Sequence, residues 1–255
     1  AVIVKNGDLV IIAGRPSMGK SALSSQIARF NAITHKKSIA YFSLEMSNIS
    51  EIQRGLFSEA GISLYDFNRG TLPRREFPKL SNAAGPYAES NLWIDDTPGI
   101  SPIQIELKCN LIKTQTGLDL IVIDYLQLMK ADGRHESRRH ELEYISRELK
   151  LIAKKFNIPV IALSQLSRKV EERKPPRPML SDLRESGAIE QDSDVVLFVY
   201  RPEYYEKTTD KKGITEIIIG KQRNGRTGYV EVFFDESSMR FKDLVKDTPE
   251  QWQND

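Results

Sequence analysis

Gly14, Gly19, Lys20 and Ser21 have the spacing G-x-x-x-x-G-K-[ST], which is typical of a loop that binds phosphate groups. Glycines allow backbone N–H groups to turn inward around phosphate oxygens without a clash from Cβ atoms. A helix starting near Lys20 would direct its first N–H groups toward the same anion. The lysine would reach the β- and γ-phosphates and the Ser21 hydroxyl would bind Mg²⁺, so we predict ATP and Mg²⁺ as ligands. The residues expected to surround the nucleotide are Gly14, Arg15, Pro16, Ser17, Met18, Gly19, Lys20, Ser21 and Ala22.

Three further polar side chains come directly after apolar runs: Asp124 ends "LIVID", Glu45 ends "YFSLE" and Gln165 ends "IALSQ". Ligands of α/β proteins bind at the carboxyl ends of strands, so all three could face the nucleotide. Asp124 could hold Mg²⁺ directly or through water, and Glu45 could orient and deprotonate the attacking water. Gln165 could sense the γ-phosphate. Structural roles remain open: a turn cap for Asp124, a helix start for Glu45, and a buried amide for Gln165.

The elements that must position these residues are short apolar runs separated by helical patterns. Several runs are apolar on both alternating faces, as expected for central strands covered on both sides. They are residues 8–14, 38–45, 91–96, 118–125, 158–165 and 194–201. We therefore predict an α/β fold with a mostly parallel central sheet flanked by helices.

The second half of the chain carries the clearest helix and hairpin signals. An amphipathic helix is predicted because apolar residues recur at three- and four-residue steps; they are Leu142, Ile145, Leu149, Ile152 and Phe156. Two strand-like runs joined around Asn224–Gly225 predict a C-terminal antiparallel hairpin. Residues 168–178, rich in proline and charge, predict a mobile loop, and a second loop is expected at 130–141.

Composition excludes several classes of protein. With 255 residues, 40% apolar and 28% charged, the chain is that of an ordinary globular domain. Cys109 is the single cysteine, and with only three histidines in the chain, neither a disulfide nor a metal cluster is expected. No apolar run reaches the length of a membrane helix, so we expect a cytoplasmic protein with no membrane partner. The net charge of +2 does not by itself demand a nucleic-acid partner.

Taken together, these segments resemble the RecA-like ATPase domain of the replicative hexameric DNA helicase family, DnaB type. The resemblance covers nearly the whole chain and follows the order of the family's motifs. It rests on "GDLVIIAGRPSMGKS", "YFSLEMS", "LIVIDYLQLM", "IPVIALSQLSR", "DLRESGAIEQDSDVVLFVYR" and "KQRNGRTG". It implies a RecA-like P-loop NTPase fold over residues 1–255, and an ATP-dependent motor that moves along single-stranded DNA and unwinds duplex DNA.

The resemblance also implies roles for individual residues. Glu45 matches the family's catalytic glutamate, Asp124 the Walker B aspartate and Gln165 the residue that senses the γ-phosphate. Lys221 and Arg223 match a basic pair that reaches the nucleotide site of the neighbouring subunit, with Arg223 as the arginine finger. From the residues alone, a solvated charge beside a hairpin turn would be the simpler reading of Arg223.

A further segment is implied to contact DNA. Arg184, Glu185 and Gly187 match a loop that touches the DNA backbone in the central channel, although one arginine beside one glutamate is hardly a basic patch. Family members assemble as homo-hexamers and work with a primase and a helicase loader. They also carry an N-terminal domain and a linker helix, which this chain lacks, so we expect a domain of a longer protein.

Two alternatives remain open from the sequence. A RecA-type recombinase would share the fold, the phosphate loop and the glutamate, but "DLRESGAIEQDSD" argues against it. A nucleotide-gated assembly module without catalysis would not need a water-activating Glu45. A P-loop kinase is less consistent with the sequence because no segment with clustered arginines resembles a lid.

Overall fold

The computed structural model describes residues 2–206 and 211–244, apart from the side chains of residues 184–186. Within these residues, a nine-stranded sheet has the order β3-β2-β4-β5-β1-β6-β7-β8-β9. The strands are β1 (Leu9–Gly14), β2 (Ile39–Ser43), β3 (Leu92–Asp95), β4 (Leu120–Asp124), β5 (Val160–Gln165), β6 (Val195–Tyr200), β7 (Ile214–Gln222), β8 (Gly228–Asp235) and β9 (Arg240–Asp243). The first six are parallel and the last three are antiparallel.

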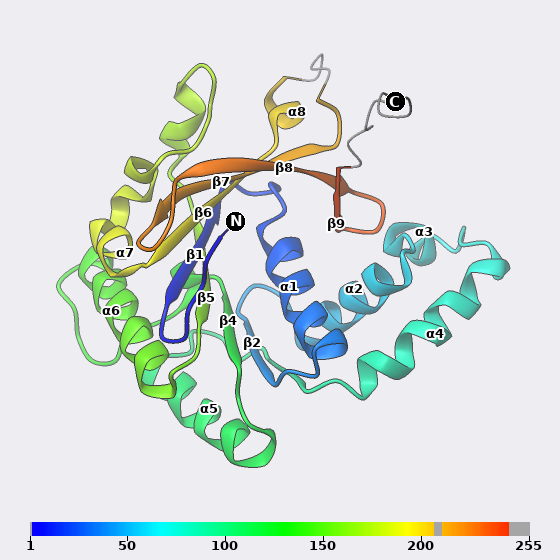
Figure 1. Cartoon of the computed structure of the whole chain (residues 1–255), viewed down its shortest axis with the longest axis horizontal. Coiled ribbons are helices and arrows are strands. Elements are labelled where there is room, and N and C mark those ends of the chain that lie inside the picture. The colour runs from blue at the N-terminus through cyan, green and yellow to red at the C-terminus, as the bar shows by residue number, and fades with distance from the viewer. Residues whose placement is uncertain (1, 207–210, 245–255) are drawn as a thin grey trace, which may run out of the picture.

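Helices cover both faces of the sheet, as Figure 1 shows. The α-helices are α1 (Lys20–Thr34), α2 (Asn48–Ala60), α3 (Leu64–Asn68), α4 (Phe77–Ala88), α5 (Pro102–Thr116), α6 (Arg138–Phe156), α7 (Gly187–Asp192) and α8 (Pro202–Tyr205). Short 3₁₀ segments are η1 (Arg74–Glu76), η2 (Leu126–Leu128), η3 (Arg168–Glu172) and η4 (Leu180–Ser186). No helix among the described residues is long and apolar enough to cross a membrane.

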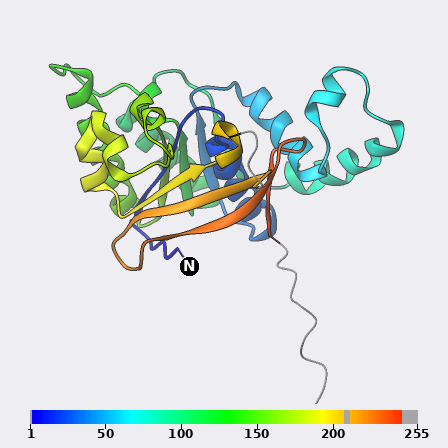
Figure 2. The same ribbon diagram turned by 90° about the horizontal axis from the view of Figure 1, so that it is seen from above.

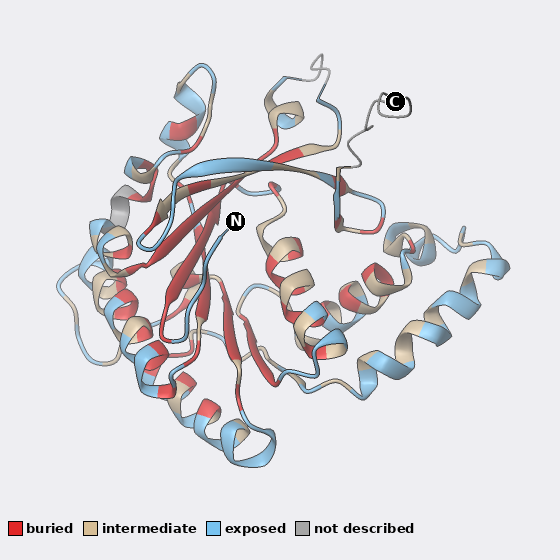
Figure 3. Cartoon of the chain, viewed as in Figure 1, coloured by how far each residue is buried: buried red, intermediate tan, exposed pale blue. Residues whose placement is uncertain are grey.

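The hydrophobic core has two layers, one on each face of the parallel strands. One layer packs the strands against α5 and α6, and the other packs them against α1. The central parallel strands β1, β2, β4, β5 and β6 and the inner sides of these helices are buried, whereas half of the β8 residues are exposed (Figure 3). All five apolar residues of the predicted amphipathic helix are buried in α6. The predicted α/β fold with its C-terminal hairpin is therefore confirmed.

The strand order determines where a ligand can bind. Because β1, β2, β4 and β5 run parallel, their carboxyl ends meet at one edge of the sheet. The antiparallel strands β7 and β8 extend the sheet beyond β6, and α2 to α4 project to one side of the molecule (Figure 2). Each residue that was predicted to act on the nucleotide from within its own chain lies at the carboxyl edge.

The two predicted loops are wrong in detail. Within 168–178, residues Arg168–Glu172 form the short helix η3, because Val170 is buried and Glu171 pairs with Arg15 at 2.8 Å. The loop at 130–141 is shorter than expected because α6 already begins at Arg138. Its N-terminus is capped by the Ser137 hydroxyl, which accepts a hydrogen bond from the His140 N–H at 3.3 Å.

Candidate active site

The loop between β1 and α1 requires glycine at two positions. A Cβ atom on Gly14 would lie 2.9 Å from the Val199 carbonyl oxygen. Gly19 has φ of +93°, and its Cβ would come 3.0 Å from the Phe241 ring. A larger residue would clash with backbone at Gly14, and at Gly19 it would be strained by the positive φ and would displace the Phe241 ring, so the tight loop predicted from the sequence is present.

Lys20, the first residue of α1, lies at the bottom of this loop. Its Nζ donates a hydrogen bond to the Arg15 carbonyl at 3.0 Å. Burial lowers the pKa of Lys20 to about 8, although the negative charges of Asp124 and Glu45 oppose this shift. A buried ammonium group with one neutral acceptor is poorly compensated, so an anion in the loop would stabilise its charge.

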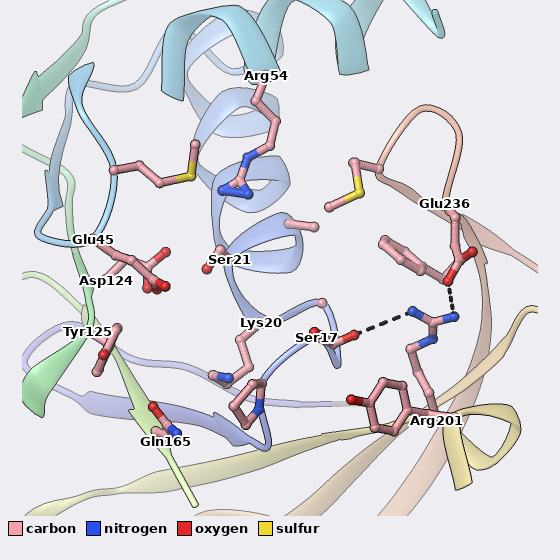
Figure 4. A pocket seen from close by; sticks show the side chains of 17 residues that line it. Ser17, Lys20, Ser21, Glu45, Arg54, Asp124, Tyr125, Gln165, Arg201 and Glu236 are labelled. Atoms are coloured by element: carbon pink, nitrogen blue, oxygen red, sulfur yellow. Dashed lines mark hydrogen bonds and ion pairs between the residues drawn. The ribbon is translucent and has the colours of Figure 1, made fainter. Parts of the chain in front are cut away.

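Asp124 and Glu45 lie side by side at the ends of two neighbouring strands, facing Lys20 and Ser21 (Figure 4). Asp124 is only 5% exposed, and burial raises the pKa of its carboxyl group, whereas a hydrogen bond from Ser21 opposes that rise. Glu45 is exposed and lies in a bend before Ser47, the N-cap of α2. It is therefore outside the helix, which removes the alternative that Glu45 serves as a residue of the first helical turn.

Gln165 ends β5, directly beside Gly14 of β1 in the parallel pairing. Its backbone N–H donates to the Gln127 side chain at 3.2 Å, while its own side chain is exposed to the cavity. The next residue, Leu166, donates its N–H to the Gly14 carbonyl at 3.2 Å. The alternative of a buried amide satisfied by backbone does not apply.

These side chains share one cavity of about 500 Å³. From the sequence-predicted set it contains Pro16, Ser17, Gly19, Lys20, Ser21, Ala22, Glu45, Asp124 and Gln165. The side chain of Arg15 instead turns away, and its guanidinium donates to the Leu166 carbonyl at 2.9 Å and pairs with Glu171. Met18 is buried beneath the loop. Arg15 and Met18 therefore shape the loop through their packing.

Several residues that line the cavity were not predicted from the sequence. They are Met46, Arg54, Tyr125, Arg201, Tyr204, Phe234, Glu236 and Met239. Arg201 follows β6 at the same sheet edge, so the strand-end argument that found Asp124 applies to it as well. Its guanidinium pairs with Glu236 and donates to the Ser17 carbonyl at 3.4 Å (Figure 4). Phe234 comes from β8 and Met239 from the turn between β8 and β9, and neither carries a signal in the sequence.

Arg54 of α2 points into the cavity above Ser21 (Figure 4). Its Nη2 donates to Glu51 at 3.3 Å, and its Nε is buried without a hydrogen-bond partner among the described residues. Glu51 is itself held by the Ser25 hydroxyl of α1. A cation therefore faces the acidic pair from the side opposite Lys20.

Lys221 and Arg223 lie far from this cavity, at the opposite edge of the sheet. β7 runs antiparallel to β6, so Lys221 is level with Val196 at the start of β6. Lys221 Nζ donates to the carbonyls of Glu190 and Ser193, and Arg223 has a side chain that is 53% exposed. Neither residue reaches the cavity of its own chain.

The segment predicted to contact DNA leads into α7, and the C-terminal end of α7 contacts this pair. Arg184 and Glu185 belong to η4, but their side chains lie outside the described residues. Gly187 is exposed and is the first residue of α7. The backbone of this segment is linked to the candidate site, because the Ser167 N–H donates to the Asp182 carbonyl of η4 at 3.3 Å.

The donor set fits a magnesium ion that also has ligands from outside the protein. Ser21 and Asp124 supply one hydroxyl and one carboxylate, and Mg²⁺ in nucleotide sites is commonly held by few protein oxygens, phosphates and water. Burial raises the pKa of Asp124, so a cation beside its carboxylate would stabilise the charged form. Among the described residues, no group of three or more His, Cys, Asp or Glu side chains could hold a metal ion.

Comparison with known proteins gives a consistent result. Residues 4–243 match the model of the family described as "DnaB-like helicase C terminal domain". The chain is 47% identical over 243 residues to the replicative DNA helicase DnaC of Bacillus subtilis, and 46% identical to the replicative DNA helicase DnaB of Geobacillus stearothermophilus. These alignments cover 95% of this chain and 54% of each relative, so the chain spans about half the length of the curated relatives it matches.

Solved structures extend the comparison to the fold. One solved ATPase domain superimposes with a TM-score of 0.91 at 39% identity, covering 94% of this chain and 86% of that domain. A DnaB-like replicative helicase, studied with its interactions with primase, gives a TM-score of 0.90 at 39% identity and covers 94% of this chain and 58% of that one. The likeness in both cases extends over nearly the whole of this chain.

Proposed function

We propose that this chain, which belongs to the family of DnaB-like helicase C-terminal domains, is the ATP-hydrolysing motor domain of a replicative DNA helicase. The observation that carries the proposal is the convergence of Lys20, Ser21, Glu45, Asp124 and Gln165 on one cavity at the carboxyl edge of the sheet. A phosphate loop alone would fit many proteins. An exposed carboxylate beside the buried Asp124 adds the means to break the phosphate bond.

Each residue has a distinct part in the proposed reaction. Lys20 and the N–H groups at the start of α1 bind the phosphates, and Ser21 and Asp124 hold Mg²⁺, which neutralises charge on the phosphates when it is bound. Glu45 accepts a proton from the attacking water, since it is solvent-accessible and lies beside Asp124. Gln165 reports the state of the γ-phosphate through Leu166 and Ser167 to η4.

The missing charge at the transition state is supplied, in this proposal, by a neighbouring subunit. Lys221 and Arg223 lie on the sheet edge opposite their own phosphate loop. A neighbouring subunit that turned its phosphate loop toward this edge would bring the two residues to its own nucleotide. Arginine fingers of this kind act by stabilising charge on the transferred phosphoryl group. The arrangement requires subunits that contact one another head to tail, and a closed homo-hexamer is the assembly we infer.

Single-stranded DNA is the proposed track for the motor, contacted by the segment with Arg184, Glu185 and Gly187. We infer a cytoplasmic replication protein that works with a primase and a helicase loader. The proposal of a primase partner is supported by the solved DnaB-like replicative helicase, which was studied with its interactions with primase.

ATPase activity measured against protein concentration, with and without single-stranded DNA, tests the proposal. Activity should rise more steeply than protein concentration, because complete sites form only between subunits, and DNA should stimulate it. Activity that is strictly proportional to concentration and indifferent to DNA would contradict the proposal. Electron microscopy that shows helical filaments in place of closed rings would favour a recombinase.

The pKa of Lys20 predicts how nucleotide affinity varies with pH. Below about pH 8 the lysine is protonated with and without nucleotide, so pH has little effect through this group. Above about pH 8, Lys20 of the free site loses its proton, and a bound polyanion restores that proton. Nucleotide binding then takes up about one proton, so nucleotide affinity falls at most about tenfold per pH unit. Calorimetry in two buffers of different ionisation enthalpy at pH 7 and 9 measures this uptake. Lys20→Arg, which stays charged, is the control and should show no uptake at pH 9.

Arg184→Ala should weaken single-stranded DNA binding by assembled rings about equally for all sequences. The reason is that a contact to the DNA backbone carries no base information. The salt dependence should flatten by about one ion, which titrations at several salt concentrations measure. Arg75→Ala removes an arginine that is 84% exposed in η1 and should leave both affinity and salt slope unchanged. A sequence-selective loss would remove Arg184 from the DNA interface.

A further inference from the structure

Arg223 is held within its own chain chiefly by one neighbour, Asp194. The Arg223 backbone N–H donates to the Asp194 carbonyl at 3.0 Å, and its Nε lies 3.4 Å from the Asp194 carboxylate. The guanidinium also donates through Nη2 to the Gln191 carbonyl at 3.4 Å. Contacts to Nε hold the base of the guanidinium while about half of the side chain stays exposed.

Asp194 is an unusually rigid partner. Its side chain is 5% exposed, and its carboxylate accepts hydrogen bonds from the Leu9 N–H at 2.8 Å and from Lys150 of α6. The Asp194 N–H donates to the Leu9 carbonyl at 2.9 Å. The carboxylate that contacts Arg223 is therefore fixed to the first residue of β1 and to α6.

Lys221, two residues before Arg223, supports the end of α7. Asp194 follows α7 by two residues, and Lys221 donates hydrogen bonds to the carbonyls of Glu190, Gln191 and Ser193 there. Cations at a helix C-terminus satisfy its free carbonyls and its dipole. The position of Arg223 is thus defined by a buried carboxylate on one side and a capped helix end on the other.

We propose that Asp194 is a positioning residue for Arg223, one that directs the guanidinium toward the neighbouring subunit. This inference rests on the proposed function, in which Arg223 completes the neighbour's site. A free arginine samples many rotamers, and each one that points elsewhere lowers the fraction of competent sites. The buried Asp194 carboxylate beside Nε and the Gln191 carbonyl at Nη2 remove that freedom, while about half of the side chain stays exposed and available for phosphate oxygens.

Mixed rings of the full-length protein test this inference. A Lys20→Ala subunit lacks a working phosphate loop but still provides Arg223. An Arg223→Ala subunit lacks the arginine but keeps its phosphate loop, so some interfaces in the mixture hold complete sites. Asp194→Asn is then added to one partner at a time. In the Lys20→Ala partner, which donates Arg223, it should lower kcat about tenfold, by analogy with the roughly 10–100-fold lost when a hydrogen-bond partner that orients a metal ligand is removed. In the Arg223→Ala partner it should change nothing, and KM for ATP should hold in both mixtures.

Lys150→Met is the matched control. It breaks the same buried ion pair but keeps the carboxylate that contacts Arg223, so any loss of activity should be equal whichever partner carries it. Where Asp194→Asn does not fold, the double variant Asp194→Asn/Lys150→Met leaves no lone buried charge and should show the same asymmetry as Asp194→Asn. Equal losses from Asp194→Asn in the two partners, or no loss in the Arg223 donor, would overturn the positioning role. A reference mixture without activity, in rings shown to exchange subunits, would overturn the action of Arg223 between subunits itself.

Discussion

Glu45→Gln should reduce ATP turnover by about 10²–10⁴-fold while nucleotide binding persists. The amide keeps the shape of the side chain but cannot accept a proton from the attacking water. Binding should persist because Glu45 lies in the bend before α2 and forms no part of the phosphate loop. Single-turnover hydrolysis together with equilibrium binding of a fluorescent ATP analogue separates the two effects.

Lys20→Ala provides the contrast. It removes the cation at the base of the loop, so binding and turnover should both be lost. Glu89→Gln, an exposed glutamate at the end of α4, should change neither. Equal loss of binding in the Glu45 and Lys20 variants would show that Glu45 supports the fold of the site, and the proton acceptor would then have to be sought elsewhere in the cavity.

The central strands could be predicted because they are apolar on both faces, a pattern that needs no knowledge of the neighbours. β1, β4 and β5 lie within two residues of their predicted starts. β9 could not be predicted in this way, because Arg240–Asp243 consists of three charged residues and a single phenylalanine. Its position depends on Gln26 of α1, whose side-chain amide donates to the Phe241 carbonyl at 2.9 Å and accepts from the Phe241 N–H at 2.8 Å.

The residues of the site could be predicted where they directly follow a strand of the parallel sheet. Glu45, Asp124 and Gln165 each come after a buried strand, and parallel strands bring their carboxyl ends together. Arg54 could not be found because it lies in α2, and its approach to the cavity depends on the packing of α2 against α1 through Glu51 and Ser25. Tertiary packing of this kind leaves no periodic signal.

Arg223→Ala should lower ATP turnover in assembled rings by about 10³–10⁵-fold, the largest effect we expect at a residue outside the cavity. ATP binding should be retained, because the cavity contains no group from β7. The distance of Arg223 from its own phosphate loop follows from the antiparallel pairing of β7 with β6, which places the two at opposite edges of the sheet. Steady-state turnover and nucleotide binding, measured on the same rings, test both statements.

The location of Arg223 makes a second, stricter demand on the same variant. If Arg223 acts between subunits, rings mixed from Arg223→Ala and Lys20→Ala chains must regain activity, since some interfaces pair an intact phosphate loop with an intact arginine. Turnover should be greatest at intermediate ratios and vanish when either chain is alone. Defects that act only within single subunits cannot produce this profile, because every active site in a mixed ring would then contain one of the two substitutions. A mixture that stays inactive at every ratio, with subunit exchange demonstrated, would leave the transition-state charge to be supplied by a cation already in the cavity, and Arg54 and Arg201 are the arginines that line it.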